Sequence, residues 1–134
     1  MSVWVFDVDG TVIDSLTSTS VRPGTGDLLD HLRAEGCTLL LWSAGGADYA
    51  RERAEAHGLA PAFDGFHGKD DRGPDGRFLT PFLQRATEAT FVDDRPEDLP
   101  HGATVVAVSP YLAANPHDRA WHRAGLLAEV SHTE

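Results

Sequence analysis

The chain has 134 residues, of which 21 are acidic and 11 are Lys or Arg, giving a formal net charge of -10. This balance argues against broad nucleic-acid binding through a basic face. Hydrophobic residues form 41% of the chain, which suits a single domain over residues 1–134 with a substantial core. No apolar run approaches the roughly 20 residues that span a bilayer, and no signal peptide is evident. We therefore expect a soluble, cytoplasmic protein without a membrane partner.

Strand-like and helix-like segments alternate along the chain. Apolar runs predict strands over residues 3–6, 37–42, 89–92 and 104–108, with a weaker strand over 63–66. Helices are expected to begin at Pro23-Gly24-Thr25, Ala47, Thr80-Pro81 and Asn115-Pro116. Residues 12–22 are rich in Ser and Thr and predict a loop or small flap. This order predicts an α/β fold, a Rossmann-like three-layer sandwich with a central, mainly parallel sheet of about five strands.

Two carboxylates end the first apolar run. Asp7 and Asp9 would point to the same side of an extended chain, so the two acids could share a site. Like charges at the end of a buried strand repel unless a cation compensates, and carboxylate oxygens suit magnesium. The alternative is a simple strand-end turn in which Gly10 supplies a permissive backbone.

The other strand ends also carry polar groups. Ser43 and Ala44 follow the second run, Lys69 follows the weak third strand, and Asp93 and Asp94 close the fourth. Ligands in open α/β sheets bind beyond the carboxyl ends of the strands, so these residues would place a metal site beside an anion site. The segment after Ser43 opens a helix, and free N–H groups at a helix start favour phosphate. Taken singly, Ser43 could be an ordinary helix start, Lys69 a solvated loop lysine, and Asp93-Asp94 a turn.

The ordered set resembles the motifs of the haloacid dehalogenase (HAD) superfamily of phosphotransferases. Asp7-Val8-Asp9-Gly10-Thr11 is similar to the first motif, and Ser43 stands where the second is expected. Lys69 is similar to the third motif, and Asp93-Asp94 to the fourth. The resemblance extends from about residue 3 to 98 and implies a magnesium-dependent phosphomonoester hydrolase.

The resemblance also implies a role for each residue. Asp7 would be the nucleophile that forms an aspartyl-phosphate, and Asp9 would be the general acid and base. Magnesium would be held by the Asp7 carboxylate, the Asp9 backbone carbonyl and Asp93. The remaining roles are phosphoryl binding by Ser43, Ala44 and Lys69, orientation of the Asp9 loop by Thr11, and support of the site by Asp94, Glu97 or Asp98.

The size of the chain bears on the substrate. Many members of this superfamily insert a cap domain after the first motif or between the second and third, but here both intervals are short. The resemblance therefore implies a capless member with an open site for a phosphorylated small molecule or an accessible macromolecular phosphate. Four side chains near the expected rim could grip a leaving group, although surface or core positions without a role are the simpler reading: Arg22, Trp42, Arg95 and His101.

Two other classes of function are compatible with parts of the pattern. A phosphoacceptor domain of the response-regulator type is also α/β, but it would carry its phosphorylated Asp after the third strand and its Lys late in the chain. Here Lys69 follows the third strand and no Lys comes after it. A non-catalytic phosphate- or partner-binding module on the HAD scaffold is the other alternative, although all principal motif positions are filled.

Overall fold

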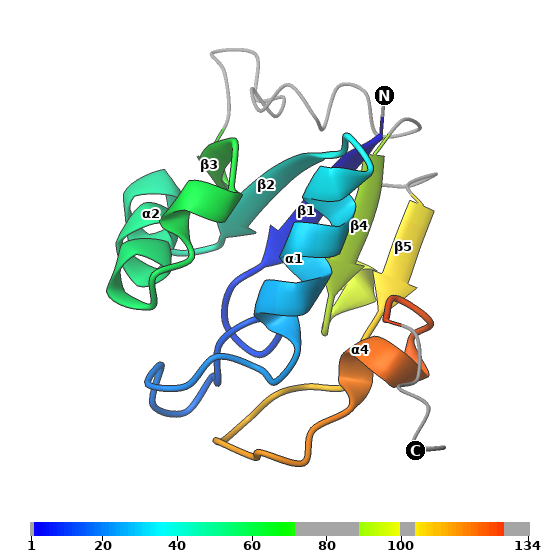
Figure 1. Cartoon of the computed structure of the whole chain (residues 1–134). Helices are drawn as coiled ribbons and strands as arrows, with labels where there is room; N and C mark the ends of the chain where they lie inside the picture. The colour runs from blue at the N-terminus through cyan, green and yellow to red at the C-terminus, as the bar shows by residue number, and fades with distance from the viewer. Residues whose placement is uncertain (1, 72–88, 100–103, 128–134) are drawn as a thin grey trace.

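The computed structural model describes residues 2–71, 89–99 and 104–127. Within these residues, one sheet contains β1 (Val3–Asp7), β2 (Thr38–Ser43), β3 (Gly65–Gly68), β4 (Ala89–Asp93) and β5 (Thr104–Ala107). The strand order is β3-β2-β1-β4-β5, and every neighbouring pair is parallel (Figure 1). The predicted α/β, Rossmann-like architecture is confirmed, with a sheet that is wholly rather than mainly parallel.

Helices flank this sheet and connect its strands. The described helices are α1 (Thr25–Ala34), α2 (Ala47–Ala56) and the short α4 (Ala120–Arg123), with 3-10 turns η1 (Ala60–Ala62) and η3 (Pro96–Asp98). Helix α1 begins after Gly24, whose φ of 85° favours glycine, and buries Leu28, Leu29 and Leu32 against the sheet. The helix predicted from Thr80-Pro81 lies outside the described residues.

Both faces of the sheet are apolar, which explains the uninterrupted apolar runs. Successive residues of a strand point to opposite faces, so Val5 and Phe6 of β1 enter different clusters. The larger cluster contains Phe6 with the buried leucines of α1 and Trp121 of α4, whose ring meets Phe6 edge to face at 6.1 Å between centroids. The smaller cluster, on the other face, contains Val5, Trp42, Ala89 and Phe91.

The predicted boundaries of the third strand and the last helix are wrong. Strand β3 occupies Gly65–Gly68 rather than 63–66, because Phe63 is buried in the larger core at the end of η1. The last helix begins at Ala120 rather than near Asn115. The Asn115 side chain accepts a hydrogen bond from the N–H of His117, and Asp118 accepts one from Ala120, so these side chains hold a turn in place of a helical start.

Residues 12–22 form the predicted small flap. Isolated bridges join Ile13 to Asp9 and to Val21. The buried Asp14 carboxylate closes the loop by accepting the backbone N–H groups of Thr17, Thr19 and Ser20 at 2.7, 2.9 and 2.9 Å. Burial alone would raise the pKa of Asp14, but its hydrogen bonds with Thr17 and Ser20 outweigh burial and hold the pKa well below its usual range. The flap and the segment after β5 lie side by side, where the strand arrows end in Figure 1.

Arg22, which closes this flap, is a core residue and not part of the rim. Its side chain is fully buried, with the guanidinium carbon 5.1 Å from the ring centroid of Tyr111 and 5.4 Å from that of Trp121. Nε of Arg22 lies 3.2 Å from a carboxylate oxygen of Asp118, and the guanidinium donates to the carbonyl of Ser109. Arg22 therefore joins the flap to the C-terminal part of the chain.

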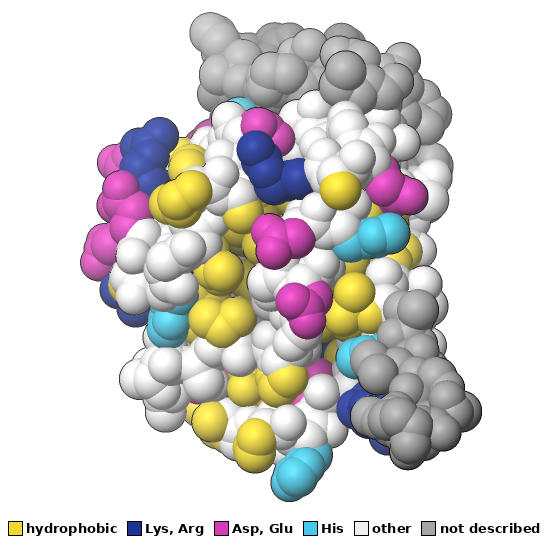
Figure 2. Space-filling model, in the orientation of Figure 1, with side chains coloured by type: hydrophobic (Ala, Val, Ile, Leu, Met, Phe, Trp, Pro, Cys, Tyr) yellow, Lys and Arg dark blue, Asp and Glu magenta, His cyan; other side chains and the backbone are white. Residues whose placement is uncertain are grey.

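The surface agrees with the charge balance of the sequence. On the face seen in Figure 2, Lys and Arg side chains lie apart from one another among acidic ones and form no continuous basic area. Across the described ranges, no helix has the length and apolar character needed to cross a bilayer.

Candidate active site

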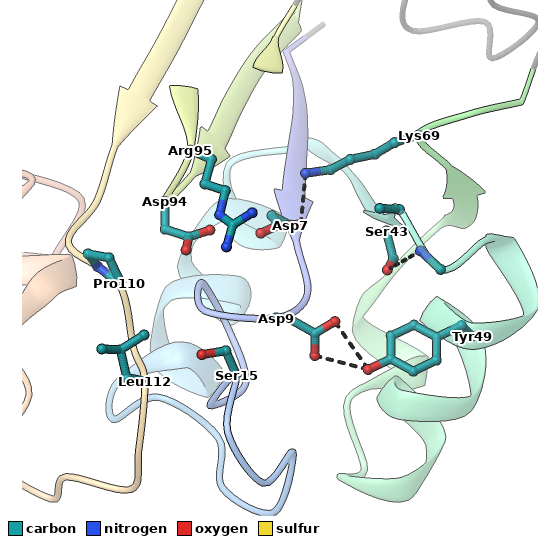
Figure 3. A pocket seen from close by; sticks show the side chains of 12 residues that line it. Asp7, Asp9, Ser15, Ser43, Tyr49, Lys69, Asp94, Arg95, Pro110 and Leu112 are labelled. Carbon is teal, nitrogen blue, oxygen red and sulfur yellow. Dashed lines mark hydrogen bonds and ion pairs between the residues drawn. The ribbon is translucent and has the colours of Figure 1, made fainter. Parts of the chain in front are cut away.

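The candidate site residues predicted from the sequence meet where the parallel strands have their carboxyl ends. Asp7, Ser43 and Asp93 are the last residues of β1, β2 and β4, and Lys69 directly follows β3. Because these strands are parallel, their carboxyl ends lie together, and the chain order reverses between β1 and β4. A cleft of about 410 Å³ opens there. Its lining residues are Asp7, Asp9, Ser15, Ser43, Ala44, Gly45, Tyr49, Lys69, Asp94, Arg95, Pro110 and Leu112 (Figure 3).

Lys69 joins two of the carboxylates. Its Nζ lies 3.0 Å from Oδ1 of Asp7 and 2.9 Å from Oδ2 of Asp93. The Asp93 side chain is completely buried and that of Asp7 is nearly so. The ammonium also lies over the ring of Trp42, 5.2 Å from the ring centroid. The single ammonium group of Lys69 thus forms ion pairs with two buried carboxylates.

The pKa values in this group follow from burial and from an excess of negative charge. Burial, reinforced by repulsion from Asp93 and opposed by Lys69, raises the pKa of Asp7 from 3.8 to about 8. Burial likewise raises the pKa of Asp93, although Lys69 opposes the change. Burial works against the charged form of Lys69, but the two carboxylates outweigh it and raise its pKa. An added cation would therefore be stabilised here.

Three carboxylates of the site fit a divalent metal. Among the described residues, ligand oxygens of Asp7, Asp93 and Asp94 all lie within 4.8 Å of one another. Carboxylate oxygens are the hard ligands that magnesium prefers. The Asp9 side chain lies outside this cluster, so Asp94, expected only to support the site, is a candidate ligand. Of the other expected supporting residues, Glu97 is exposed and Asp98 belongs to η3.

Thr11 connects the ends of β1 and β4. Its hydroxyl oxygen lies 3.2 Å from Oδ2 of Asp7 and 3.2 Å from Oδ1 of Asp94, and it accepts the backbone N–H of Asp94 at 3.2 Å. Thr11 therefore contacts two members of the acidic cluster, and its expected role in orienting the Asp9 loop stays a prediction. The loop itself is held by backbone hydrogen bonds of Gly10 with Ile13 and Tyr111, both at 2.8 Å.

We predict that Gly10→Ala weakens magnesium binding at least tenfold. Gly10 has a φ of +82°, and a β-carbon there would lie 2.5 Å from Oδ2 of Asp94, so the carboxylate must move. Gly36→Ala is the matched control, because Gly36 has a φ of +83° but open space around it. Titration calorimetry should show weaker binding for the Gly10 variant only. Equal affinity in both variants and the wild type would contradict the assigned place of Asp94.

Ser43 and the residues after it line the side of the cleft that the sequence predicts to bind an anion. The Ser43 hydroxyl oxygen accepts the N–H of Gly45 at 3.0 Å, which leaves its proton available to an anion. The carbonyl of Ser43 accepts the N–H of Lys69 at 2.8 Å and thereby ties the lysine to the end of β2. Helix α2 starts here behind Gly46 without a side-chain cap. Ala44 is exposed and lines the cleft.

Tyr49 is the site residue that sequence reasoning missed. Its hydroxyl donates to the Asp9 carboxylate, at 3.0 Å from Oδ1 and 3.1 Å from Oδ2. In Figure 3 the Asp9 side chain points toward α2 and away from Lys69. The available signal was the position of Tyr49 in the first turn of a helix that opens at a strand end.

Arg95, Trp42 and His101 complete the residues expected near the rim. Arg95 is exposed and lines the cleft, and its backbone N–H donates to Oδ1 of Asp93 at 2.8 Å. Trp42 is buried under Lys69 and belongs to the smaller core cluster. His101 lies outside the described residues.

Comparison with known proteins shows a similarity to part of a viral protein. No family model matches the sequence. Over 63 residues, the chain is 41% identical to an uncharacterized 36.0 kDa protein of Orgyia pseudotsugata multicapsid polyhedrosis virus. The match covers 46% of this chain and 20% of the viral protein, so the chain spans only a small part of that protein's length.

Proposed function

We propose that the protein is a magnesium-dependent phosphomonoester hydrolase of the HAD type, with a single capless domain over residues 1–134. The observation that supports this most is the cluster of Asp7, Asp93 and Asp94, whose ligand oxygens lie within 4.8 Å of one another, with Lys69 bridging two of them. The same cleft contains the Ser43 hydroxyl and the start of α2. Cation and anion sites side by side suit phosphoryl transfer, which depends on charge stabilisation and positioning.

The proposed reaction has two steps. An oxygen of Asp7 attacks phosphorus, the bond from phosphorus to the ester oxygen breaks, and Asp9 gives its proton to that leaving oxygen. Asp9 then removes a proton from water, which attacks phosphorus, releases inorganic phosphate and regenerates the Asp7 carboxylate. Lys69, Ser43 and backbone N–H groups from Ala44 onward hold the phosphoryl oxygens throughout.

Magnesium fits the carboxylates that the site presents. Asp7, Asp93 and Asp94 would hold it, together with the backbone carbonyl of Asp9 expected from the HAD resemblance. When bound, it would offset the negative charge of the phosphate and of the acids around it. The substrate is expected to be a phosphorylated small molecule or an accessible phosphate of a macromolecule, because among the described residues the cleft opens at the strand ends, between loops and the first turn of α2.

The response-regulator alternative is disfavoured by topology. Those domains have the strand order 2-1-3-4-5, whereas this sheet has the order β3-β2-β1-β4-β5. Such a domain would also carry its phosphorylated Asp after the third strand and its Lys late in the chain, whereas here Lys69 directly follows β3. A binding module without catalysis would use the same residues, so it must be separated from the hydrolase by experiment.

The test is hydrolysis of p-nitrophenyl phosphate after treatment with a chelator, with and without added magnesium. We expect turnover only when magnesium is present, because the metal would offset the negative charge that the phosphate adds to a site where Lys69 already bridges two buried carboxylates. Binding of magnesium and phosphate without turnover of this ester or of a panel of phosphate esters would favour the binding module. Failure to bind magnesium would overturn the hydrolase proposal.

A further inference from the structure

We infer that Tyr49 is a positioning residue that holds the Asp9 carboxylate in place for proton transfer to the leaving group. The inference rests on the proposed hydrolase function and extends it to a residue that neither the motifs nor the acidic cluster include. The Tyr49 hydroxyl lies 3.0 and 3.1 Å from the two Asp9 oxygens, so one donor restrains both ends of the carboxylate (Figure 3). Such a contact fixes the rotation of the side chain.

Tyr49 is itself held firmly. It lies in the first turn of α2 and packs against the larger core cluster. A β-carbon at Gly45 would lie 3.0 Å from its ring, which shows how closely the backbone before α2 approaches it. On its other side, the Arg53 guanidinium carbon lies 6.0 Å from the ring centroid. Burial, then the hydrogen bond to Asp9, raises the pKa of Tyr49, so the phenol remains a donor.

The position of Asp9 explains why it needs such a support. Asp9 follows β1 in a loop, and its carboxylate lies outside the cluster that Lys69 and Thr11 organise. Lys69 is a strong competing attraction for any mobile carboxylate in the same cleft. A carboxylate that turned toward Lys69 would leave the position from which it can reach a leaving oxygen. Proton transfer requires a separation of about 2.6–3.2 Å, so a small rotation is enough to interrupt it.

This role predicts a dependence on the leaving group. An alkoxide is a poor leaving group and needs a proton as the bond to phosphorus breaks, whereas p-nitrophenolate leaves without one. Tyr49→Phe should therefore lower kcat/KM for ethyl phosphate at least tenfold and for p-nitrophenyl phosphate about twofold or less. A substitution that only destabilised the fold would lower kcat/KM for the two esters to the same extent.

The experiment compares wild type, Tyr49→Phe and Asp9→Asn with these two esters at saturating magnesium. Tyr111→Phe is the matched control, because its hydroxyl bonds Ser20 and the N–H of Asn115 and does not contact Asp9. We expect the difference between esters to be largest for Asp9→Asn, intermediate for Tyr49→Phe and absent for Tyr111→Phe. Magnesium affinity, measured by calorimetry, should be the same in Tyr49→Phe and wild type.

The outcomes separate this inference from the proposed function. If wild type is active and Tyr49→Phe loses activity equally for both esters, or loses none, the positioning role is wrong and the hydrolase proposal stands. If wild type hydrolyses neither ester with magnesium present, the hydrolase proposal fails and the role of Tyr49 fails with it.

Discussion

Asp7→Asn is expected to abolish magnesium-dependent hydrolysis and, at the same time, to stabilise the metal-free protein at pH 8. The loss of turnover, by more than about 1,000-fold, follows from removing the proposed nucleophile. The gain in stability follows from removing an acid that is costly to bury and that repels Asp93, with which it shares Lys69. Proteins often retain such costly charges at functional sites because activity requires them.

The pH range of this effect follows from the raised pKa of Asp7. The ordinary value is 3.8 and the folded value is about 8, so the unfolded chain loses this proton first as the pH rises. The group therefore lowers the stability of the folded state progressively between about pH 4 and pH 8, and fully above pH 8. The variant should gain up to about 5 kcal/mol in free energy of unfolding at pH 8 and little near pH 4.

Urea denaturation in the presence of a chelator measures this gain at the two pH values. Asp30→Asn serves as the control, because Asp30 is exposed on α1 and this substitution removes the same formal charge as Asp7→Asn. A gain at pH 8 that is shared by the control would point to net charge in general. If Asp7→Asn gave no gain in free energy of unfolding at pH 8, the inference that the buried Asp7 carboxylate destabilises the metal-free fold would be wrong.

Lys69→Met is expected to destabilise the metal-free protein by about 3 kcal/mol and to lower turnover at least 100-fold. The change leaves Asp7 and Asp93 buried without the ammonium that lies 3.0 and 2.9 Å from them. Removing one partner of a buried ion pair costs more than the pair itself contributes, because the remaining charge cannot be solvated. Adding magnesium should restore most of the stability, because it binds the same carboxylates, but little of the turnover.

Thermal unfolding with chelator and with magnesium tests this rescue. Arg51→Met is a suitable control, because Arg51 is an exposed cation whose ion pair with Asp48 is also on the surface. The double variant Asp7→Asn/Lys69→Met should be more stable than Lys69→Met alone, since one unpaired acid is gone. If Lys69→Met were as stable as wild type without metal, the electrostatic account of the site would be wrong.

Several features of this protein could be predicted because their cause is local. A strand buried on both faces must be apolar throughout, so the runs ending at Asp7, Ser43 and Asp93 mark three strands and their carboxyl ends. Helix α1 could be placed by its spaced leucines and by the glycines on either side. Once the sheet is parallel, the meeting of the strand-end residues at one edge follows from geometry.

Other features depended on contacts between distant parts of the chain. Tyr49 meets Asp9 across 40 positions, and Thr11 meets Asp94 across 83. Such pairs leave no periodic trace in the sequence, because each partner satisfies only its own local rules. The same holds for Arg22, whose buried place depends on Tyr111 and Trp121 much later in the chain.

The sequence by itself therefore determined the parallel α/β architecture and the group of residues at the sheet edge. The tertiary structure decided which acids gather into a cluster, that Asp94 belongs to it, and that the Asp9 carboxylate turns to Tyr49. It also placed β3 two residues later than its apolar residues suggest, because Phe63 packs in the core and pairing with β2 begins at Gly65. The physical reason is common to all of these: patterns of burial repeat along the chain, whereas hydrogen bonds and ion pairs across the sheet edge depend on the fold that burial has already built.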